Sequence, residues 1–165
     1  MSSDAFPTRI ALSEAVDILR HVAGSRRLGN ERIATSRADG RVLAADVVAP
    51  VALPPFDNSA MDGFALRHGD LSAAGETALR LAGEQFAGPD LGLALAAGEC
   101  VRITTGAPLP HGADAVLIRE NAIVADGIVT VPAGLATGAN VRRRAEDGAE
   151  GDIVLRAGQV LPPAR

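Results

Sequence analysis

Two carboxylates in one short segment are the first feature of this sequence that could do chemistry. The segment "PPFDNSAMDGFAL", residues 54–66, contains Asp57 and Asp62. Its prolines favour an extended approach, and Asp, Asn and Ser are residue types that form caps and turns. A rigid turn of this kind can present Asp62 or Asp57 to a ligand without a further ordering cost. The alternative is a structural corner whose polar side chains satisfy their own backbone, and residue types alone leave both interpretations open.

A second segment, "RITTGAPLPHGADAVLIREN" (residues 102–121), combines hydroxyls with a glycine. We expect a strand to end at Ile103 and a turn with free hydroxyl and N–H groups to follow over residues 104–108. Such a turn can hold an oxyanion such as phosphate. It can equally be a hairpin corner in which the threonine hydroxyls bond to the backbone.

A third segment, "NVRRRAEDGAEGD" (residues 140–152), places three arginines one residue before two acids. In a strand, Arg142, Arg143 and Arg144 alternate between faces, so at most two of them point the same way. The segment is therefore either a solvated, charged edge strand, or a site where an arginine binds an anion and Asp147 helps to hold a divalent cation.

Composition excludes several classes of function. The chain has 165 residues, enough for one ordinary domain or two small ones, with a net charge of −4, four Phe and no Trp or Tyr. The acidic balance and the missing aromatic platforms argue against binding to nucleic acid or to membranes, an RNA-binding β-domain included. The histidines lack metal-ligand spacing, and we expect the single cysteine, Cys100, to be buried and inert. Because we find neither a signal peptide nor an 18-residue apolar stretch, we expect a cytoplasmic protein.

The elements that must position these segments are mostly short strands. Residues 11–24 carry apolar side chains three or four apart, which predicts a helix. From residue 52 onward, short runs of Val, Ile and Leu alternate with Gly, Pro and Asp, which predicts strands and tight turns. We expect one hairpin in residues 121–131, turning at Asp126–Gly127, and another in residues 152–161, turning at Ala157–Gly158. The fold class is mainly β with a few helices (α+β), and the missing βαβ alternation argues against a Rossmann fold.

Taken together and in this order, the three segments closely resemble the N-terminal region of the MoeA family. These are the molybdopterin molybdotransferases, related to the E domain of gephyrin. The resemblance runs from the first helix to the end of the chain and implies irregular, bent β-sheets in two subdomains. Proline-rich and glycine-rich junctions place one subdomain at residues 1–50 plus 140–165 and an inserted β-rich one at 51–139. The pterin-binding and C-terminal domains of the family have no counterpart here.

The resemblance implies a reaction. Members of the family insert molybdenum from molybdate into the dithiolene of adenylylated molybdopterin, release AMP and depend on a divalent cation, usually Mg²⁺. The residue types suit these species, because Mg²⁺ prefers carboxylate and water oxygens, whereas oxyanions prefer N–H, hydroxyl and guanidinium donors.

The same resemblance assigns roles to individual residues. The catalytic residues would be Asp62 of "AMDG", Thr105 before "GAP", and Asp147 at the end of the motif that reads "RRxGED" in the family. Asp62 and Asp147 would also be the metal ligands. The residues expected to bind substrate are Arg142, Ser59 and Gly106. One position departs from the pattern: Ala145 replaces the usual glycine, which makes a left-handed turn there less comfortable.

The resemblance also implies partners. The family forms an elongated homodimer whose active-site cleft combines the N-terminal region of one subunit with the pterin-binding domain of the other. We therefore expect this chain to be inactive alone, and a molybdopterin adenylyltransferase to be its pathway partner. The alternative is a non-catalytic dimerisation or scaffold module in which the Asp62 turn is structural.

Overall fold

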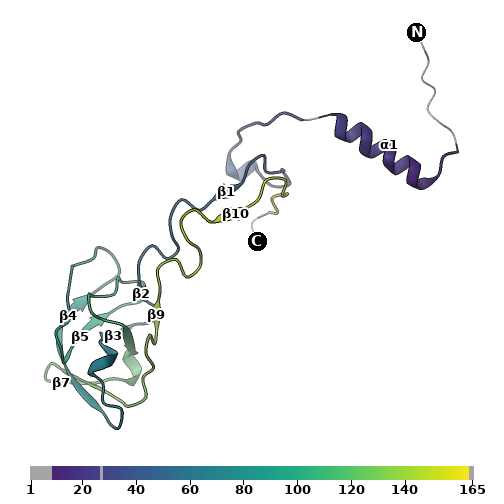
Figure 1. Cartoon of the computed structure of the whole chain (residues 1–165). Helices are drawn as coiled ribbons and strands as arrows, with labels where there is room; N and C mark the ends of the chain where they lie inside the picture. The colour runs from purple at the N-terminus through teal and green to yellow at the C-terminus, as the bar shows by residue number, and fades with distance from the viewer. Residues whose placement is uncertain (1–8, 27, 164–165) are drawn as a thin grey trace. The chain divides into compact units, whose positions relative to one another are not determined.

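The computed structural model describes residues 9–26 and 28–163 (Figure 1). The described chain is mainly β, which confirms the predicted fold class. Its helices are α1 (Leu12–Ser25) and the short 3-10 helices η1 (Thr35–Arg37), η2 (His68–Asp70) and η3 (Arg119–Asn121). Its strands are β1 (Val47–Val48), β2 (Asn58–Ser59), β3 (Gly63–Leu66), β4 (Thr77–Gln85), β5 (Glu99–Ile103), β6 (Ala115–Ile118), β7 (Ile123–Ala125), β8 (Ile128–Val131), β9 (Val141–Arg142) and β10 (Ile153–Leu155).

The chain forms two compact units, Met1–Ala45 with Ala157–Arg165, and Asp46–Arg156. The subdomain boundaries expected from the sequence, at residues 50/51 and 139/140, stay a prediction. Within the first unit, residues 40–43 pair with residues 159–161 through backbone hydrogen bonds of 2.8–2.9 Å. All three sequence motifs, residues 54–66, 102–121 and 140–152, lie in the second unit.

Helix α1 confirms the helix predicted from periodicity. It begins one residue later than expected and ends at Ser25, with Glu14 in its first turn, where the helix dipole favours a negative charge. None of its residues is buried, so its apolar stripe faces solvent within the described chain. Across residues 9–26 and 28–163, no helix is long and apolar enough to cross a membrane.

One of the two predicted hairpins is confirmed. Strands β7 and β8 pair antiparallel around Asp126 and Gly127, which have φ values of 50° and 76°. Positive φ at both turn residues suits the right-handed twist of a two-residue hairpin. The second predicted hairpin is wrong. Strand β10 pairs with β1, and Val160 pairs with Val42, so the segments on either side of residues 157–158 take partners from earlier in the chain instead of each other.

The second unit is built on a six-stranded sheet in the order β6-β3-β5-β4-β8-β7. Every neighbouring pair is antiparallel except β4 and β5, which are parallel. The segment between these two strands, residues 86–98, must therefore return from the end of β4 to the start of β5. As a result, the ends of β4 and β5 lie side by side, with Gln85 opposite Ile103.

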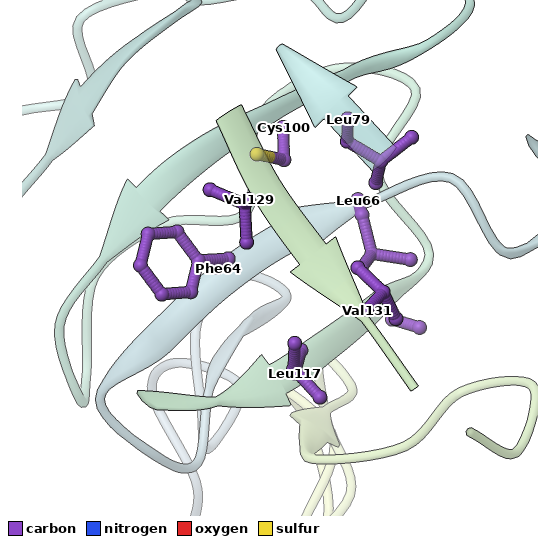
Figure 2. Packing of buried hydrophobic residues seen from close by; sticks show 8 residues of the cluster. Phe64, Leu66, Leu79, Cys100, Leu117, Val129 and Val131 are labelled. Atoms are coloured by element: carbon purple, nitrogen blue, oxygen red, sulfur yellow. The ribbon is translucent and has the colours of Figure 1, made fainter. Parts of the chain in front are cut away.

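The sheet curls around its own core. Strand β8 is three strands from β3 in the sheet order, yet Val129 and Val131 of β8 belong to the same buried cluster as Phe64 and Leu66 of β3. Figure 2 shows β8 crossing over this part of the sheet, with apolar side chains in the space between them. Cys100 of β5 is fully buried in this cluster, as predicted, and burial raises the pKa of its thiol to about 11.

Strand register brings four loop junctions to one end of the sheet. Gly63 at the start of β3 lies opposite Ile103 at the end of β5 and opposite Ile118 at the end of β6. The residue before β3 and the residues after β5 and β6 are therefore neighbours in space. The end of β4 joins them through its parallel pairing with β5.

Gly63 is required by a close approach between strands. A Cβ atom added there would lie 1.9 Å from the carbonyl oxygen of Leu117 on β6. We predict that Gly63→Ala lowers the free energy of unfolding by about 1–3 kcal/mol, because backbone must move to admit the methyl group. Urea denaturation measures the loss, and Gly75→Ala is the control, since no atom lies within 4 Å of an added Cβ there. Equal stabilities of the two variants would contradict the prediction.

Candidate functional site

The three motifs meet at strand β2. On one side β2 pairs with β9, with Asn58 opposite Arg142 and Ser59 opposite Val141. On the other side the Ser59 N–H donates to the Ala107 carbonyl at 3.1 Å, and the Gly106 N–H donates to the Ser59 carbonyl at 2.8 Å. The segment 54–66 is therefore the central piece, and the other two motifs are hydrogen-bonded to its two edges.

A hydroxyl shapes the turn that leads to Asp62. The Ser59 side chain is 1% exposed; its hydroxyl donates to the Met61 carbonyl at 2.6 Å and accepts from the Met61 N–H at 3.3 Å. This local turn is the capped corner that the sequence predicted. Both hydrogen bonds of the hydroxyl that the structure shows lie within the turn. Contact between Ser59 and a substrate stays a prediction.

Asp62 lies at the exposed end of that turn and is held by Thr105. One carboxylate oxygen, Oδ1, accepts hydrogen bonds from the Thr105 N–H at 2.8 Å and from the Thr105 hydroxyl at 3.0 Å. These bonds are the main reason that the pKa of Asp62 lies below its usual value, with smaller contributions from the charges of Arg119 and Arg102. Within residues 9–26 and 28–163, Oδ2 has no hydrogen-bond donor. The turn thus keeps the acid ionised, fixes one oxygen and leaves the other exposed.

The predicted oxyanion-binding turn at residues 104–108 is not formed as expected. The N–H groups of residues 104–107 donate, in order, to the Gln85 carbonyl, the Asp62 carboxylate, the Ser59 carbonyl and the Thr104 carbonyl. The expectation of free N–H groups is therefore wrong, because β4, β2 and Asp62 supply acceptors for three of them and the Thr104 carbonyl of the turn itself supplies the fourth. Gly106 has a φ of 79°, so its glycine serves the left-handed turn rather than an open N–H.

Asp57 joins the first motif to the third. Its Oδ1 accepts from the Arg144 N–H at 2.7 Å, and its Oδ2 accepts from the Arg143 guanidinium at 2.8 Å. The backbone bond from Arg144 is the largest cause of a lowered Asp57 pKa, followed by the bond from Arg143. Both oxygens are thus engaged, so of the two acids that the sequence offered for a ligand, Asp62 is the one with an unoccupied oxygen.

Arg142 and Asp147, predicted to have separate roles, bind each other. The Arg142 guanidinium forms an ion pair with Asp147 Oδ2 and a second one, at 3.2 Å, with Glu146 Oε1. Asp147 first and Glu146 second raise the pKa of Arg142 above its usual value. Both partners remain substantially exposed, with 40% and 55% of the Arg142 and Asp147 side chains accessible, so solvent competes for the pair.

Ala145 adopts the left-handed conformation that its replacement of glycine made doubtful. Its φ is 65°, which costs a residue with a Cβ about 1–2 kcal/mol. The Ala145 N–H donates to the Pro54 carbonyl at 3.0 Å, and the Asp147 N–H donates to the Leu53 carbonyl at 2.9 Å. The turn is therefore formed despite the substitution, because docking against residues 53–54 holds it.

Metal ligands do not gather around these acids. Among the residues that the structure describes, no group of three or more His, Cys, Asp or Glu side chains could hold a metal ion. Asp62 offers one free oxygen, whereas Asp147 Oδ2 is already paired with Arg142. The residues that the structure describes therefore supply single oxygen donors and not a complete set of cation ligands.

Two arginines near Asp62 were missed by the sequence analysis. Arg119 directly follows β6, and its N–H donates to the Asp62 carbonyl at 3.0 Å; Arg102 lies on β5 opposite Phe64. Both carry ion pairs with acids, Glu120 and Glu84 respectively. Their proximity to Asp62 follows from strand register, which residue types along the chain do not reveal.

Comparisons with known proteins agree on one family. The model of the MoeA N-terminal region (domain I and II) matches residues 10–165. The molybdopterin molybdenumtransferase of Haemophilus influenzae is 39% identical over 134 residues, covering 81% of this chain and 33% of the relative. The enzyme of the same name from Synechococcus elongatus is 36% identical over 159 residues, covering 93% of this chain and 39% of the relative. The chain thus spans between a third and two fifths of these curated relatives.

A solved structure extends the similarity to the fold. The molybdopterin biosynthesis moeA protein from Pyrococcus horikoshii superposes with a TM-score of 0.74 at 33% sequence identity. The superposition covers 81% of this chain and 36% of that protein. The similarity therefore involves most of this chain and a minor part of its relative.

Low pH should weaken the hydrogen bonds by which Asp57 connects the first motif to the third. The Asp57 pKa is lowered below its ordinary value of 3.8, so the carboxylate stabilises the fold fully above that pH, and the contribution is lost as the pH falls through the folded-state pKa. We predict that the unfolding free energy of Asp57→Asn varies less with pH below about 3.8 than that of the unsubstituted protein. Urea denaturation across this range tests it, with the exposed Asp39→Asn as control. Identical pH dependence in the Asp57 variant and the unsubstituted protein would contradict it.

Proposed function

The chain belongs to the MoeA family, whose N-terminal region it matches, and we propose that it is the N-terminal part of a molybdopterin molybdotransferase. In this proposal the complete protein inserts molybdenum from molybdate into adenylylated molybdopterin during molybdenum cofactor biosynthesis in the cytoplasm. The support comes from the family match and from the names of the curated relatives.

The observation that carries the proposal is the geometry of Asp62. The acid is ionised, exposed and fixed through one oxygen by two bonds from Thr105, so its second oxygen has a defined direction. An oriented carboxylate needs little reorganisation when a cation or a proton donor of a substrate arrives. We therefore assign Asp62 as the catalytic carboxylate and Thr105 as the residue that orients it.

The charged pair in the third motif has a complementary role in this proposal. The Arg142 guanidinium belongs to an exposed ion pair with Asp147. A guanidinium is a suitable donor to a phosphate or molybdate oxygen. An incoming oxyanion would compete with Asp147 for Arg142 and release the Asp147 carboxylate. In this proposal Gly106 and Ser59, whose backbones are hydrogen-bonded to each other, would also contact the substrate.

A divalent cation fits this site only if protein carboxylates and the substrate bind it together. Mg²⁺ is commonly bound by one or two protein carboxylates together with substrate phosphates and water. Asp62 would supply one such oxygen, and Asp147 a second once Arg142 has left it. A bound Mg²⁺ would neutralise charge on substrate phosphates, while the described residues contribute orientation and the guanidinium.

Because this chain spans about a third of its relatives, we propose that it contributes part of a divided site. The pterin-binding groups would come from a region outside this chain, in a homodimer, and a molybdopterin adenylyltransferase would supply the adenylylated substrate. The chain alone would then show no molybdenum insertion. The competing proposal, a non-catalytic scaffold module, treats the Asp62–Thr105 contact as structural.

A chimera separates the two proposals. This chain replaces the matching region of the Haemophilus influenzae relative, and molybdenum insertion is assayed with and without Asp62→Asn. The amide keeps an acceptor for Thr105 but loses the charge, so we predict a loss of activity of at least about 100-fold with only a small decrease in melting temperature. Glu76→Gln, which changes an exposed acid directly before β4, is the matched control and should keep full activity. An active Asp62→Asn chimera would favour the scaffold proposal. So would a chimera whose melting temperature is clearly lower and which regains activity when the assay is run below that temperature.

A further inference from the structure

A buried glutamine at the end of β4 organises the loop that follows it. Gln85 is 1% exposed, and its side-chain amide donates to the Phe86 carbonyl at 2.9 Å and to the Pro89 carbonyl at 3.0 Å. Its side-chain oxygen accepts from the Leu91 N–H at 3.0 Å. A single side chain thus satisfies three backbone groups of residues 86–91, which would otherwise have no strand partner.

The loop organised by Gln85 is hydrogen-bonded to the turn that holds Asp62. The Ala87 N–H donates to the Thr104 hydroxyl oxygen at 3.0 Å, and the Thr104 N–H donates to the Gln85 carbonyl at 3.3 Å. These contacts exist because β4 and β5 are parallel, so the residues after both strands emerge at the same end of the sheet. Thr104 is therefore held from both its hydroxyl and its N–H by the segment that begins at Gln85.

We propose that Gln85 is a positioning residue for the Asp62 site. It acts through residues 86–91 and Thr104 and fixes the backbone that leads into Thr105. Thr105 in turn donates its N–H and its hydroxyl to Asp62. Without this support, Thr104 would lose the loop contact that holds its side chain, and the Thr105 donors would no longer be aligned on Asp62. The structural part of the inference is independent of the reaction, and its consequence for catalysis rests on the proposed function.

The chemistry of the amide explains why a glutamine occupies this position. Two donors and one acceptor are used at once, a combination that the amide side chain provides. Glutamate has nearly the same shape but lacks the two donors, and its charge would face the Phe86 and Pro89 carbonyl oxygens in a buried position. Asparagine is one methylene shorter and cannot reach the same three groups from the same backbone.

The test follows the Thr105 amide by NMR in the whole chain. In Gln85→Glu we expect the Thr105 amide proton to move upfield, because its bond to a carboxylate weakens, and to exchange with solvent at least about tenfold faster. The control is Thr77→Val, at the opposite end of β4, which removes the acceptor of the Ser72 N–H (2.8 Å) from a different loop. It should leave the Thr105 amide unchanged. A folded Gln85→Glu protein with the shift and exchange rate of the unsubstituted chain would overturn the proposal.

A second variant covers the case in which Gln85→Glu does not fold. Thr104→Val removes the acceptor for the Ala87 N–H one step closer to Asp62 and leaves the buried amide in place. It should produce the same upfield shift and faster exchange at Thr105, and unchanged values would overturn the proposal. In the chimera, Gln85→Glu should lower kcat more than it raises KM. Because NMR does not need an active enzyme, an inactive unsubstituted chimera would refute the proposed function and leave this test standing.

Discussion

The paired hydrogen bonds from Thr105 to one oxygen of Asp62 are the contact on which the candidate site depends. Asp62 directly precedes β3 and Thr105 lies two residues beyond β5, so the contact closes the end of an antiparallel strand pair. Neither residue is buried, which means that apolar packing does not fix the carboxylate. Its direction comes from the strands, from the Ser59 turn and from the two Thr105 donors. The same bonds lower the Asp62 pKa and leave Oδ2 without a donor among the described residues. The contact therefore sets both the direction and the charge of the carboxylate.

The two acids of the first motif divide the work between them. Asp57 uses both oxygens to attach residues 143–144, so it joins two motifs and has no oxygen left for a ligand. Asp62 uses one oxygen for attachment and keeps one free. Strand β2 lies between them and is bonded to the second motif on one edge and to the third on the other. This two-residue strand thus connects the three motifs through its backbone hydrogen bonds.

Local sequence signals predicted much of this arrangement. Periodicity identified α1, the Asp-Gly pair identified the β7–β8 hairpin, and the motif order identified the family. Long-range pairing could not be predicted in the same way. The segment around Ala157–Gly158 looks like a hairpin, but its strands find partners more than a hundred residues earlier. Residue types alone suggest free N–H groups in the Thr104–Ala107 turn, but Gln85 of β4, Ser59 of β2, the Asp62 carboxylate and the turn itself supply acceptors for them. Gln85 gives no signal at all, because its importance comes from a parallel strand pair that brings distant loops together.

The measurement that tests the central claim most directly is a carbon-detected NMR titration of the Asp62 carboxyl group, with and without Thr105→Val. If Thr105 holds the ionised acid, the Asp62 pKa lies below 3.8 in the unsubstituted chain and rises toward that value when the hydroxyl donor is removed. An Asp62 pKa at or above 3.8, unaffected by the substitution, would show that the carboxylate is not held as described, and the catalytic assignment of Asp62 would then lose its structural basis.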